Sequence, residues 1–123
     1  MQIKTGIDII EVSRIKNAIE SSNNKFLERV FTEKEIEYCN SKGLNKYEHL
    51  AARFAAKEAC LKAISDLLEN KFDISWKEIE ILNSKDGRPI LNLYKEIKNI
   101  ESIDVSLSHL KDYAVANVSA IIK

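Results

Sequence analysis

Hydrophobic and polar residues alternate at the start of the chain and then recur at helical spacing. Residues 2–10 alternate in part and predict a strand, one face of which carries Ile3, Thr5, Ile7 and Ile9. The next segment, residues 13–20, has the spacing of a short helix. Ser13 stands directly before its apolar positions, so we expect this hydroxyl residue to cap the helix.

The following stretch breaks into short helical pieces. Residues 21–24, Ser-Ser-Asn-Asn, predict a turn, and residues 24–30 predict one or two helical turns. Thr32 is followed three residues later by Glu35, which is the spacing of a capping box. A further helix is therefore predicted to begin here and to end near Gly43.

The strongest helical pattern covers roughly residues 46–69. At about 100° per residue, one face carries large apolar side chains, namely Leu50, Phe54, Leu61, Ile64 and Leu68. A second face carries small ones suited to close packing, namely Ala52, Ala56, Ala59 and Ala63. Two apolar faces predict a helix that is buried on most of its sides.

The second half of the chain reads mainly as strands. Asp86-Gly87 lies between two apolar runs and predicts a hairpin. Residues 94–100 predict a short helix, and residues 103–109 and 113–122 predict two closing strands. Because no repeat or linker interrupts this order, we expect one domain over residues 1–123. Its predicted class is α+β, with mostly antiparallel strand pairing and a sheet packed against the long helix.

Composition narrows the class of protein. Nineteen basic and nineteen acidic residues give a net charge of zero, which argues against nucleic-acid or membrane binding driven by charge. Cys39 and Cys60 are too few for a disulfide framework and are expected to pack as small apolar groups. The sequence begins with no basic segment followed by an apolar run, and no stretch approaches a membrane span. A soluble cytoplasmic protein is the expectation.

Four charged residues stand out on the alanine-rich helix. Arg53 and Lys57 fall within or beside its apolar face, where a charge must reach water, form a pair or bind an anion. Glu58 and Lys62 lie on a narrow polar stripe. From spacing alone, the favoured interpretation of Glu58 and Lys62 is a solvated i,i+4 pair worth about 0.2–0.5 kcal/mol.

Other polar residues also admit ordinary structural interpretations. Asp8 interrupts an apolar strand, which is costly unless the carboxylate is paired or binds a metal ion. Gly6, two residues earlier, leaves room beside it. His109 ends the pattern Val-Ser-Leu-Ser-His, where a lone histidine is usually a core or loop residue. No spacing typical of zinc ligands, nucleotide-binding glycine loops or a catalytic triad is present.

Taken in order, these segments resemble the acyl-carrier-protein synthase family of small 4′-phosphopantetheinyl transferases. The resemblance rests on GIDIIEVSRI (6–15), FTEKEIEYC (31–39), RFAAKEA (53–59), DGRP (86–89) and SLSHLKDYAVA (106–116). It runs from residue 3 to about residue 121. The chain departs from the family in lacking a second glycine before Asp8 and a glycine in the loop after the long helix. The second departure bears on the shape of the connection over residues 65–75.

The resemblance implies a function. Such enzymes move the 4′-phosphopantetheine arm of coenzyme A to a serine of apo acyl carrier protein in fatty acid biosynthesis, and release adenosine 3′,5′-bisphosphate. Asp8 and Glu58 match the family's catalytic magnesium ligands. The residues that match its coenzyme contacts are Arg53, Lys57, Lys62, Gly87, Arg88, Pro89, Ser108 and His109. A metal-bound water and Glu58 remain alternatives for the base that takes the serine proton.

The family resemblance also implies partners. The family's small members are homotrimers with active sites between subunits. Acyl carrier protein is acidic and helical, so basic residues around apolar anchors are expected to bind it. The candidates, which ordinary amphipathic helices would also explain, are Arg14, Ile15, Lys16, Lys25, Phe26 and Arg29. Two other functions stay open: a non-enzymatic module that binds acidic proteins, and a magnesium-dependent nucleotide hydrolase.

Overall fold

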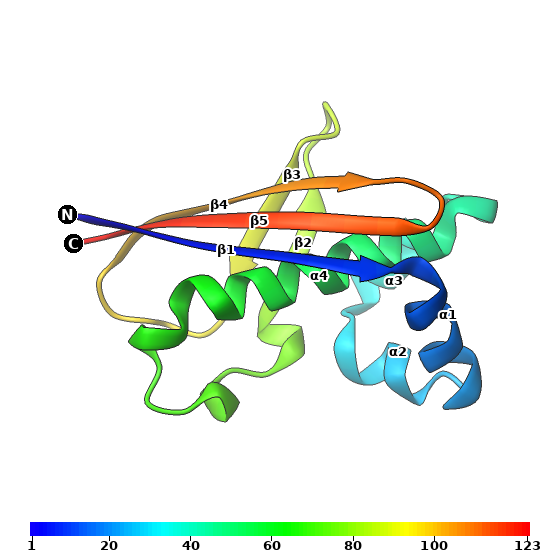
Figure 1. Cartoon of the computed structure of the whole chain (residues 1–123), viewed down its shortest axis with the longest axis horizontal. Helices are drawn as coiled ribbons and strands as arrows, with labels where there is room; N and C mark the ends of the chain where they lie inside the picture. Colours follow the sequence, from blue (N-terminus) through cyan, green and yellow to red (C-terminus); the bar gives the residue numbers. More distant parts are fainter.

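The computed structural model describes residues 1–123 and contains a three-stranded antiparallel sheet that lies along one long helix (Figure 1). The strands are β1 (Gln2–Glu11), β4 (Ile100–His109) and β5 (Tyr113–Ile122), in the spatial order β1-β5-β4. Pairing of Gln2 with Ile122 brings the two termini to the same end of the sheet. The predicted first and last strands and the antiparallel α+β class are confirmed.

The long helix, α4 (Lys46–Ile64), packs closely against the inner face of this sheet. A Cβ atom at Gly6 would lie 2.0 Å from the Ala59 carbonyl oxygen and 2.8 Å from the Ala63 nitrogen. The small residues of both elements therefore allow the helix backbone to touch the strand. The alanine face of α4 is buried, as the pattern predicts. On the large apolar face Leu50 and Ile64 are buried, whereas Phe54 and Leu61 are only half-buried. This contact fixes how Asp8 on β1 faces the polar stripe of α4.

Three short helices follow β1 and surround the first half of α4. They are α1 (Val12–Ser21), α2 (Lys25–Val30) and α3 (Glu33–Asn40). The predicted capping box is present, because the Thr32 hydroxyl accepts from the Glu35 nitrogen and the Glu35 carboxylate accepts from the Thr32 nitrogen. One apolar cluster lies among these helices, and a second lies between α4 and the strands.

A two-stranded hairpin forms the remaining part of the sheet structure. Strands β2 (Ile79–Asn83) and β3 (Pro89–Leu93) pair antiparallel, as predicted around Asp86-Gly87. Gly87 has φ of 89°, a left-handed conformation that glycine adopts without steric cost. The tip of the hairpin thus tolerates the sharp turn that the sequence indicates.

The outer face of the three-stranded sheet has no covering layer within the chain. The face that carries the β1 isoleucines points outward, and Ile3, Ile7 and Ile9 are 68%, 61% and 66% exposed. Tyr113 on β5 is 50% exposed on the same sheet. We call the surface formed by Ile3, Ile7, Ile9 and Tyr113 the open sheet face.

Three local predictions are wrong. Helix α1 begins at Val12 with Glu11 at the cap position, so Ser13 lies inside the helix. Residues 94–100 form no helix, because Asn99 adopts a left-handed φ of 74° and Ile100 already starts β4. The long helix ends at Ile64 and continues only as the 3₁₀ turn η2 (Ser65–Leu67).

The 3₁₀ turn η1 (Gly43–Asn45) connects α3 to α4, and the turns η3 (Lys71–Asp73) and η4 (Trp76–Glu78) lie in the connection from α4 to β2. Cys39 and Cys60 are buried free thiols, which confirms that they pack as small apolar groups. None of the helices combines the length and the hydropathy that crossing a membrane would require.

Candidate functional site

Asp8 and Glu58 line one groove of about 360 Å³. Asp8 comes from β1 and Glu58 from α4, and the close packing at Gly6 holds these two elements together. The groove continues along α1 and α2, where Arg14, Ile15, Ala18 and Phe26 line it, and Phe54 of α4 also contributes to its lining. We call it the carboxylate groove. The structure therefore brings the two predicted metal ligands to the same groove as three of the six predicted partner-binding residues, Arg14, Ile15 and Phe26.

Lys62 pairs with Asp8 rather than with Glu58. Its Nζ lies 3.2 Å from Asp8 Oδ1 and donates to the Ile7 carbonyl oxygen at 2.9 Å. The Lys62 side chain is 54% exposed, so its ammonium group remains open to further anions. This geometry excludes the reading of Glu58 and Lys62 as a simple solvated pair.

The electrostatics of Glu58 suit a bound cation. Burial raises the pKa of its carboxyl, and the neighbouring charge of Asp8 raises it further, while Lys62 and Lys71 oppose the shift. Two carboxylates held near one another gain from a cation between them. The chain has no cluster of three or more potential ligands. A magnesium ion fits such a pair, since it commonly uses one or two carboxylates and completes its shell with water and phosphate.

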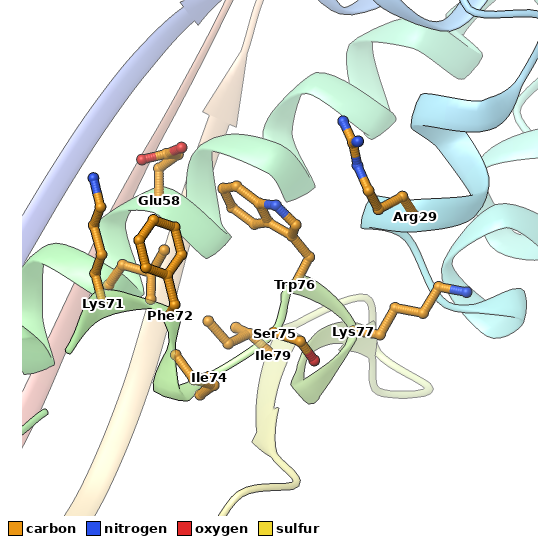
Figure 2. Close-up of a pocket in the computed structure, with 10 residues that line it drawn as sticks. Arg29, Glu58, Lys71, Phe72, Ile74, Ser75, Trp76, Lys77 and Ile79 are labelled. Carbon is orange, nitrogen blue, oxygen red and sulfur yellow. The ribbon is translucent and has the colours of Figure 1, made fainter. Parts of the chain in front are cut away.

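Glu58 also lies at the edge of a larger cavity of about 710 Å³, shown in Figure 2. We call it the apolar pocket, because Leu61, Phe72, Ile74, Trp76 and Ile79 line it, together with Arg29, Lys71, Ser75 and Lys77. In Figure 2 the side chains of Lys71 and Trp76 extend to the side of Glu58, whereas Lys77 points away. The rings of Phe54 and Trp76 stack at 5.3 Å, so an aromatic wall connects the carboxylate groove to the apolar pocket.

A separate cavity of about 200 Å³ brings together four of the predicted coenzyme contacts, namely Arg53, Gly87, Pro89 and His109. We call it the hairpin pocket; its lining residues are Tyr38, His49, Ala52, Arg53, Asn83, Gly87, Pro89, Leu107 and His109. It shares no lining residue with the carboxylate groove. The predicted site residues thus form two separate groups on one chain.

Arg53 is the centre of the hairpin pocket. It is 1% exposed, and its guanidinium carbon lies 4.3 Å from the centre of the Tyr38 ring. One terminal nitrogen donates to Asn83 Oδ1, and Asn83 Nδ2 donates to the Gly87 carbonyl at 3.0 Å. The buried Nε atom of Arg53 has no hydrogen-bond partner. Such a donor is costly unless a ligand accepts from it.

The other predicted coenzyme contacts differ in their placement. His109 lines the hairpin pocket, with Nδ1 3.0 Å from Glu48 Oε1. Ser108 is exposed and, as the preceding strand residue, faces the opposite side of β4. Arg88 is exposed at the hairpin tip and pairs with Asp104 at 2.9 Å. Neither Ser108 nor Arg88 lines the hairpin pocket of its own chain.

Lys57 is held in the interior. Both Lys57 and Glu35 have fully buried side chains, and their charged atoms lie 2.8 Å apart. The ammonium group also donates to the carbonyl oxygens of Trp76 at 3.0 Å and Ile79 at 2.6 Å. Three acceptors use all three ammonium protons. These contacts argue against the predicted phosphate contact and indicate a structural role.

The predicted partner-binding residues lie at or near the carboxylate groove. Arg14, Lys25 and Arg29 are exposed, and Phe26 is half-buried against Phe54. Ile15 is only 2% exposed, so it shapes the floor of the groove rather than offering apolar area.

Sequence reasoning did not identify several residues of these cavities. Tyr38, His49 and Asn83 line the hairpin pocket, and Lys71 and Trp76 line the apolar pocket. Only His49 carried a usable signal, because it lies one helical turn before Arg53 and so shares its side of α4. The others reach their cavities through long-range packing that spacing does not show.

Comparison with known proteins places the chain in a class. The model of the 4′-phosphopantetheinyl transferase superfamily matches residues 4–118. The chain therefore belongs to this superfamily, as the sequence motifs indicate.

Individual relatives share one description. The holo-[acyl-carrier-protein] synthase of Chloroherpeton thalassium is 47% identical over 118 residues, which cover 94% of this chain and 95% of the relative. The holo-[acyl-carrier-protein] synthase of Ruminiclostridium cellulolyticum is also 47% identical, over 94% of this chain and 90% of the relative.

Solved structures agree over the whole fold. The Chronobacterium ammoniagenes synthase in complex with coenzyme A superposes with a TM-score of 0.84 at 28% identity, covering 100% of this chain and 99% of that one. The Bacillus anthracis holo-(acyl-carrier-protein) synthase in complex with coenzyme A (3′,5′-ADP) superposes with a TM-score of 0.78 at 38% identity. The match covers 98% of this chain and 96% of that one.

Proposed function

We propose that this chain transfers the 4′-phosphopantetheine arm of coenzyme A to a serine of apo acyl carrier protein, giving holo acyl carrier protein and adenosine 3′,5′-bisphosphate. The observation that carries the proposal is the shared groove of Asp8 and Glu58, which lies beside Arg14 and Phe26. Membership in the superfamily and the description shared by the relatives support it. Fatty acid biosynthesis is the process it serves in this proposal.

The reaction is a phosphoryl transfer, and it requires stabilisation of the negative charge on the phosphate oxygens. The serine oxygen forms a bond to the β-phosphorus, the bond from that phosphorus to the bridging oxygen breaks, and the adenosine bisphosphate leaves with the electron pair. Lys62, whose side chain is half-exposed beside Asp8, is placed to hold pyrophosphate oxygens. Glu58 is the carboxylate of the groove available to take the hydroxyl proton.

Magnesium is part of this proposal. Asp8 and Glu58 would hold the ion, which would neutralise charge on the phosphates when bound. The raised pKa of the Glu58 carboxyl, caused by burial and by Asp8, supports a cation there. The chain's own contribution is to fix the two carboxylates on β1 and α4 through the tight contact at Gly6.

We further propose a homotrimer with active sites between subunits. The hairpin pocket and the carboxylate groove share no residues, so each chain offers two half-sites. The open sheet face, with three isoleucines more than half exposed, supplies apolar area for subunit contacts. In such an assembly Ser108 and Arg88, which lie outside the hairpin pocket, remain available to a coenzyme on a neighbouring subunit. A cytoplasmic location and a single domain over residues 1–123 remain predictions.

The carrier protein is proposed to dock along α1 and α2. Arg14, Lys25 and Arg29 supply positive charge, and Phe26 lies beside them over the floor formed by Ile15. A purely non-enzymatic binding module would need these residues but would give no role to the paired carboxylates. We therefore favour the transferase.

A direct assay tests the proposed function. The protein is mixed with coenzyme A, magnesium and an apo acyl carrier protein, and mass spectrometry follows the carrier. We expect the mass of one phosphopantetheine arm to be added to the carrier, and the product to require magnesium. Glu58→Gln should abolish the addition, whereas the matched variant Glu69→Gln, at an exposed position outside all three cavities described, should not. Turnover of coenzyme A without a carrier would support a hydrolase instead.

A further inference from the structure

The hairpin pocket holds positive charge without a matching anion. Arg53 is almost fully buried with an unpartnered Nε, and Lys42 lies 4.7 Å from the Tyr38 ring that Arg53 also contacts. No carboxylate lines the pocket. The carboxylate of Glu48, the residue before His49, is engaged with Nδ1 of His109 at 3.0 Å. An anionic ligand would satisfy both the charge and the orphaned donor.

Two histidines face one another in this pocket. The His49 and His109 rings lie 4.7 Å apart between centres, at 62°. His49 also packs edge-on against Tyr38 at 5.8 Å. These contacts involve the rings only, and His49 takes part in none of the side-chain hydrogen bonds that Arg53, Asn83 and His109 form. Its nitrogens are therefore free to meet a ligand.

We propose that His49 is a further coenzyme-recognition residue, which binds the 3′-phosphate of coenzyme A beside His109 and takes up one proton as it does so. This inference rests on the proposed function, because it concerns the phosphomonoester that distinguishes coenzyme A from 3′-dephospho-coenzyme A. It adds His49 to the phosphate-binding residues of this pocket, of which the sequence motifs supply only Arg53 and His109.

The charges that face His49 explain why the proton arrives with the ligand. Burial, together with the neighbouring His109, Arg53 and Lys42, lowers the pKa of His49 to about 4, whereas Glu48 opposes this shift. His49 is therefore neutral at pH 7 without ligand. A phosphomonoester carries a charge of about −1.5 to −2 and favours a protonated imidazole beside it. Only one proton is expected, because two imidazolium rings in contact repel each other.

Calorimetry with two ligands tests the inference. Coenzyme A and 3′-dephospho-coenzyme A are titrated into the wild-type protein between pH 7 and 8.5, where the phosphomonoester is nearly all dianion. Repeating each titration in buffers of different ionisation enthalpy measures proton uptake. We expect uptake of roughly one proton for coenzyme A and almost none for the 3′-dephospho ligand. The affinity for coenzyme A should fall as pH rises, because binding then consumes a scarcer proton.

His49→Phe supplies the decisive variant, because it keeps an aromatic ring against Tyr38 and His109 and removes the titrating nitrogens. We expect it to weaken coenzyme A binding about ten-fold, the effect of one lost charge-assisted hydrogen bond, and to leave 3′-dephospho-coenzyme A binding unchanged. A thermal melt confirms that the variant is folded. Unchanged proton uptake or unchanged discrimination in His49→Phe overturns the inference. If the wild-type protein binds neither ligand, the proposed function itself fails.

Discussion

Lys57 and Glu35 form a fully buried ion pair, with Nζ 2.8 Å from Oε1. The same carboxylate accepts from the Thr32 nitrogen and, through Oε2, from the Ile81 nitrogen at 2.9 Å. The pair therefore joins the start of α3 and strand β2 to the helix position next to Glu58. Its atoms are fully satisfied, which is the condition under which a buried pair can be tolerated.

We predict that Lys57→Met lowers the free energy of unfolding by about 3–5 kcal/mol, because it leaves the Glu35 carboxylate buried without its partner. Urea denaturation measures the loss. Lys4→Met is the matched control, since it breaks the exposed Lys4–Asp66 pair at 2.7 Å and should cost less than about 1 kcal/mol. A folded Lys57→Met protein of normal stability that binds coenzyme A poorly would instead assign Lys57 to the phosphates.

Close packing of β1 on α4 gives a second prediction. Gly6→Ala should destabilise the protein by about 3 kcal/mol or more, because its Cβ would meet backbone atoms that cannot move independently. Gly43→Ala has nothing within 4 Å of its Cβ and only a left-handed φ of 56°, so it should cost about 1 kcal/mol. Thermal unfolding compares the two variants. Equal losses of stability in the two variants would contradict the prediction, because they would show that a Cβ at residue 6 is accommodated without a clash.

The sequence predicted the fold where local chemistry decides it. Alternation located β1, β4 and β5, the capping box located α3, and Asp86-Gly87 located the hairpin. The prediction failed at residues 94–100, where the spacing of a helix is present but the chain forms none. Asn99 adopts a left-handed conformation there, and β4 begins at the next residue, Ile100. The prediction also extended α4 beyond Ile64, where no glycine marks the end.

The candidate site was predictable only in part. The family motifs named Asp8, Glu58 and Arg53. In the structure Asp8 and Glu58 line the carboxylate groove, and Arg53 lines the hairpin pocket. Spacing could not show that Lys62 pairs with Asp8, since that contact depends on how β1 packs on α4. The burial of Lys57 against Glu35 was likewise hidden, because a lysine that pairs in the core and one that meets a ligand have the same helical spacing.

The open sheet face leads to a prediction about assembly. We expect the wild-type protein to be a homotrimer and Ile7→Asp to dissociate it, because a carboxylate would replace an isoleucine that is 61% exposed on that face. Ile90→Asp, at a 42% exposed isoleucine on the hairpin, is the control and should remain trimeric. Light scattering coupled to size exclusion gives the mass. A fully active wild-type monomer would contradict the proposed assembly.

Arg14 gives a prediction about the carrier protein. Arg14→Glu should raise the KM for apo acyl carrier protein about ten-fold or more, because it reverses a charge at the groove that an acidic partner is proposed to enter. The affinity for coenzyme A, measured by calorimetry, should change little. Lys34→Glu reverses an exposed charge on α3 outside the groove and serves as the control. A loss of coenzyme affinity with a normal KM for the carrier would place Arg14 in the other half-site.

The last prediction treats Asp8 and Glu58 as one metal-binding unit. Asp8→Ala and Glu58→Ala should each reduce kcat by about 100-fold or more, because either change removes charge control at the phosphates. The double variant should lose only a few-fold more, since two ligands of one ion act together and their effects are not additive. Activity measured against magnesium concentration, with Glu69→Ala as the control, tests this.

Measurements of stability distinguish a metal-binding role of Asp8 and Glu58 from a purely structural role. Asp8 contacts a Lys62 side chain that is 54% exposed, so Asp8→Ala should change the free energy of unfolding by less than about 1 kcal/mol. A structural acceptor at Asp8 would instead cost about 1–3 kcal/mol when removed, and Glu58→Ala would then leave activity intact. An active Glu58→Ala enzyme with unchanged magnesium dependence would rule out the assignment of both carboxylates to one ion, whatever the melting temperatures show.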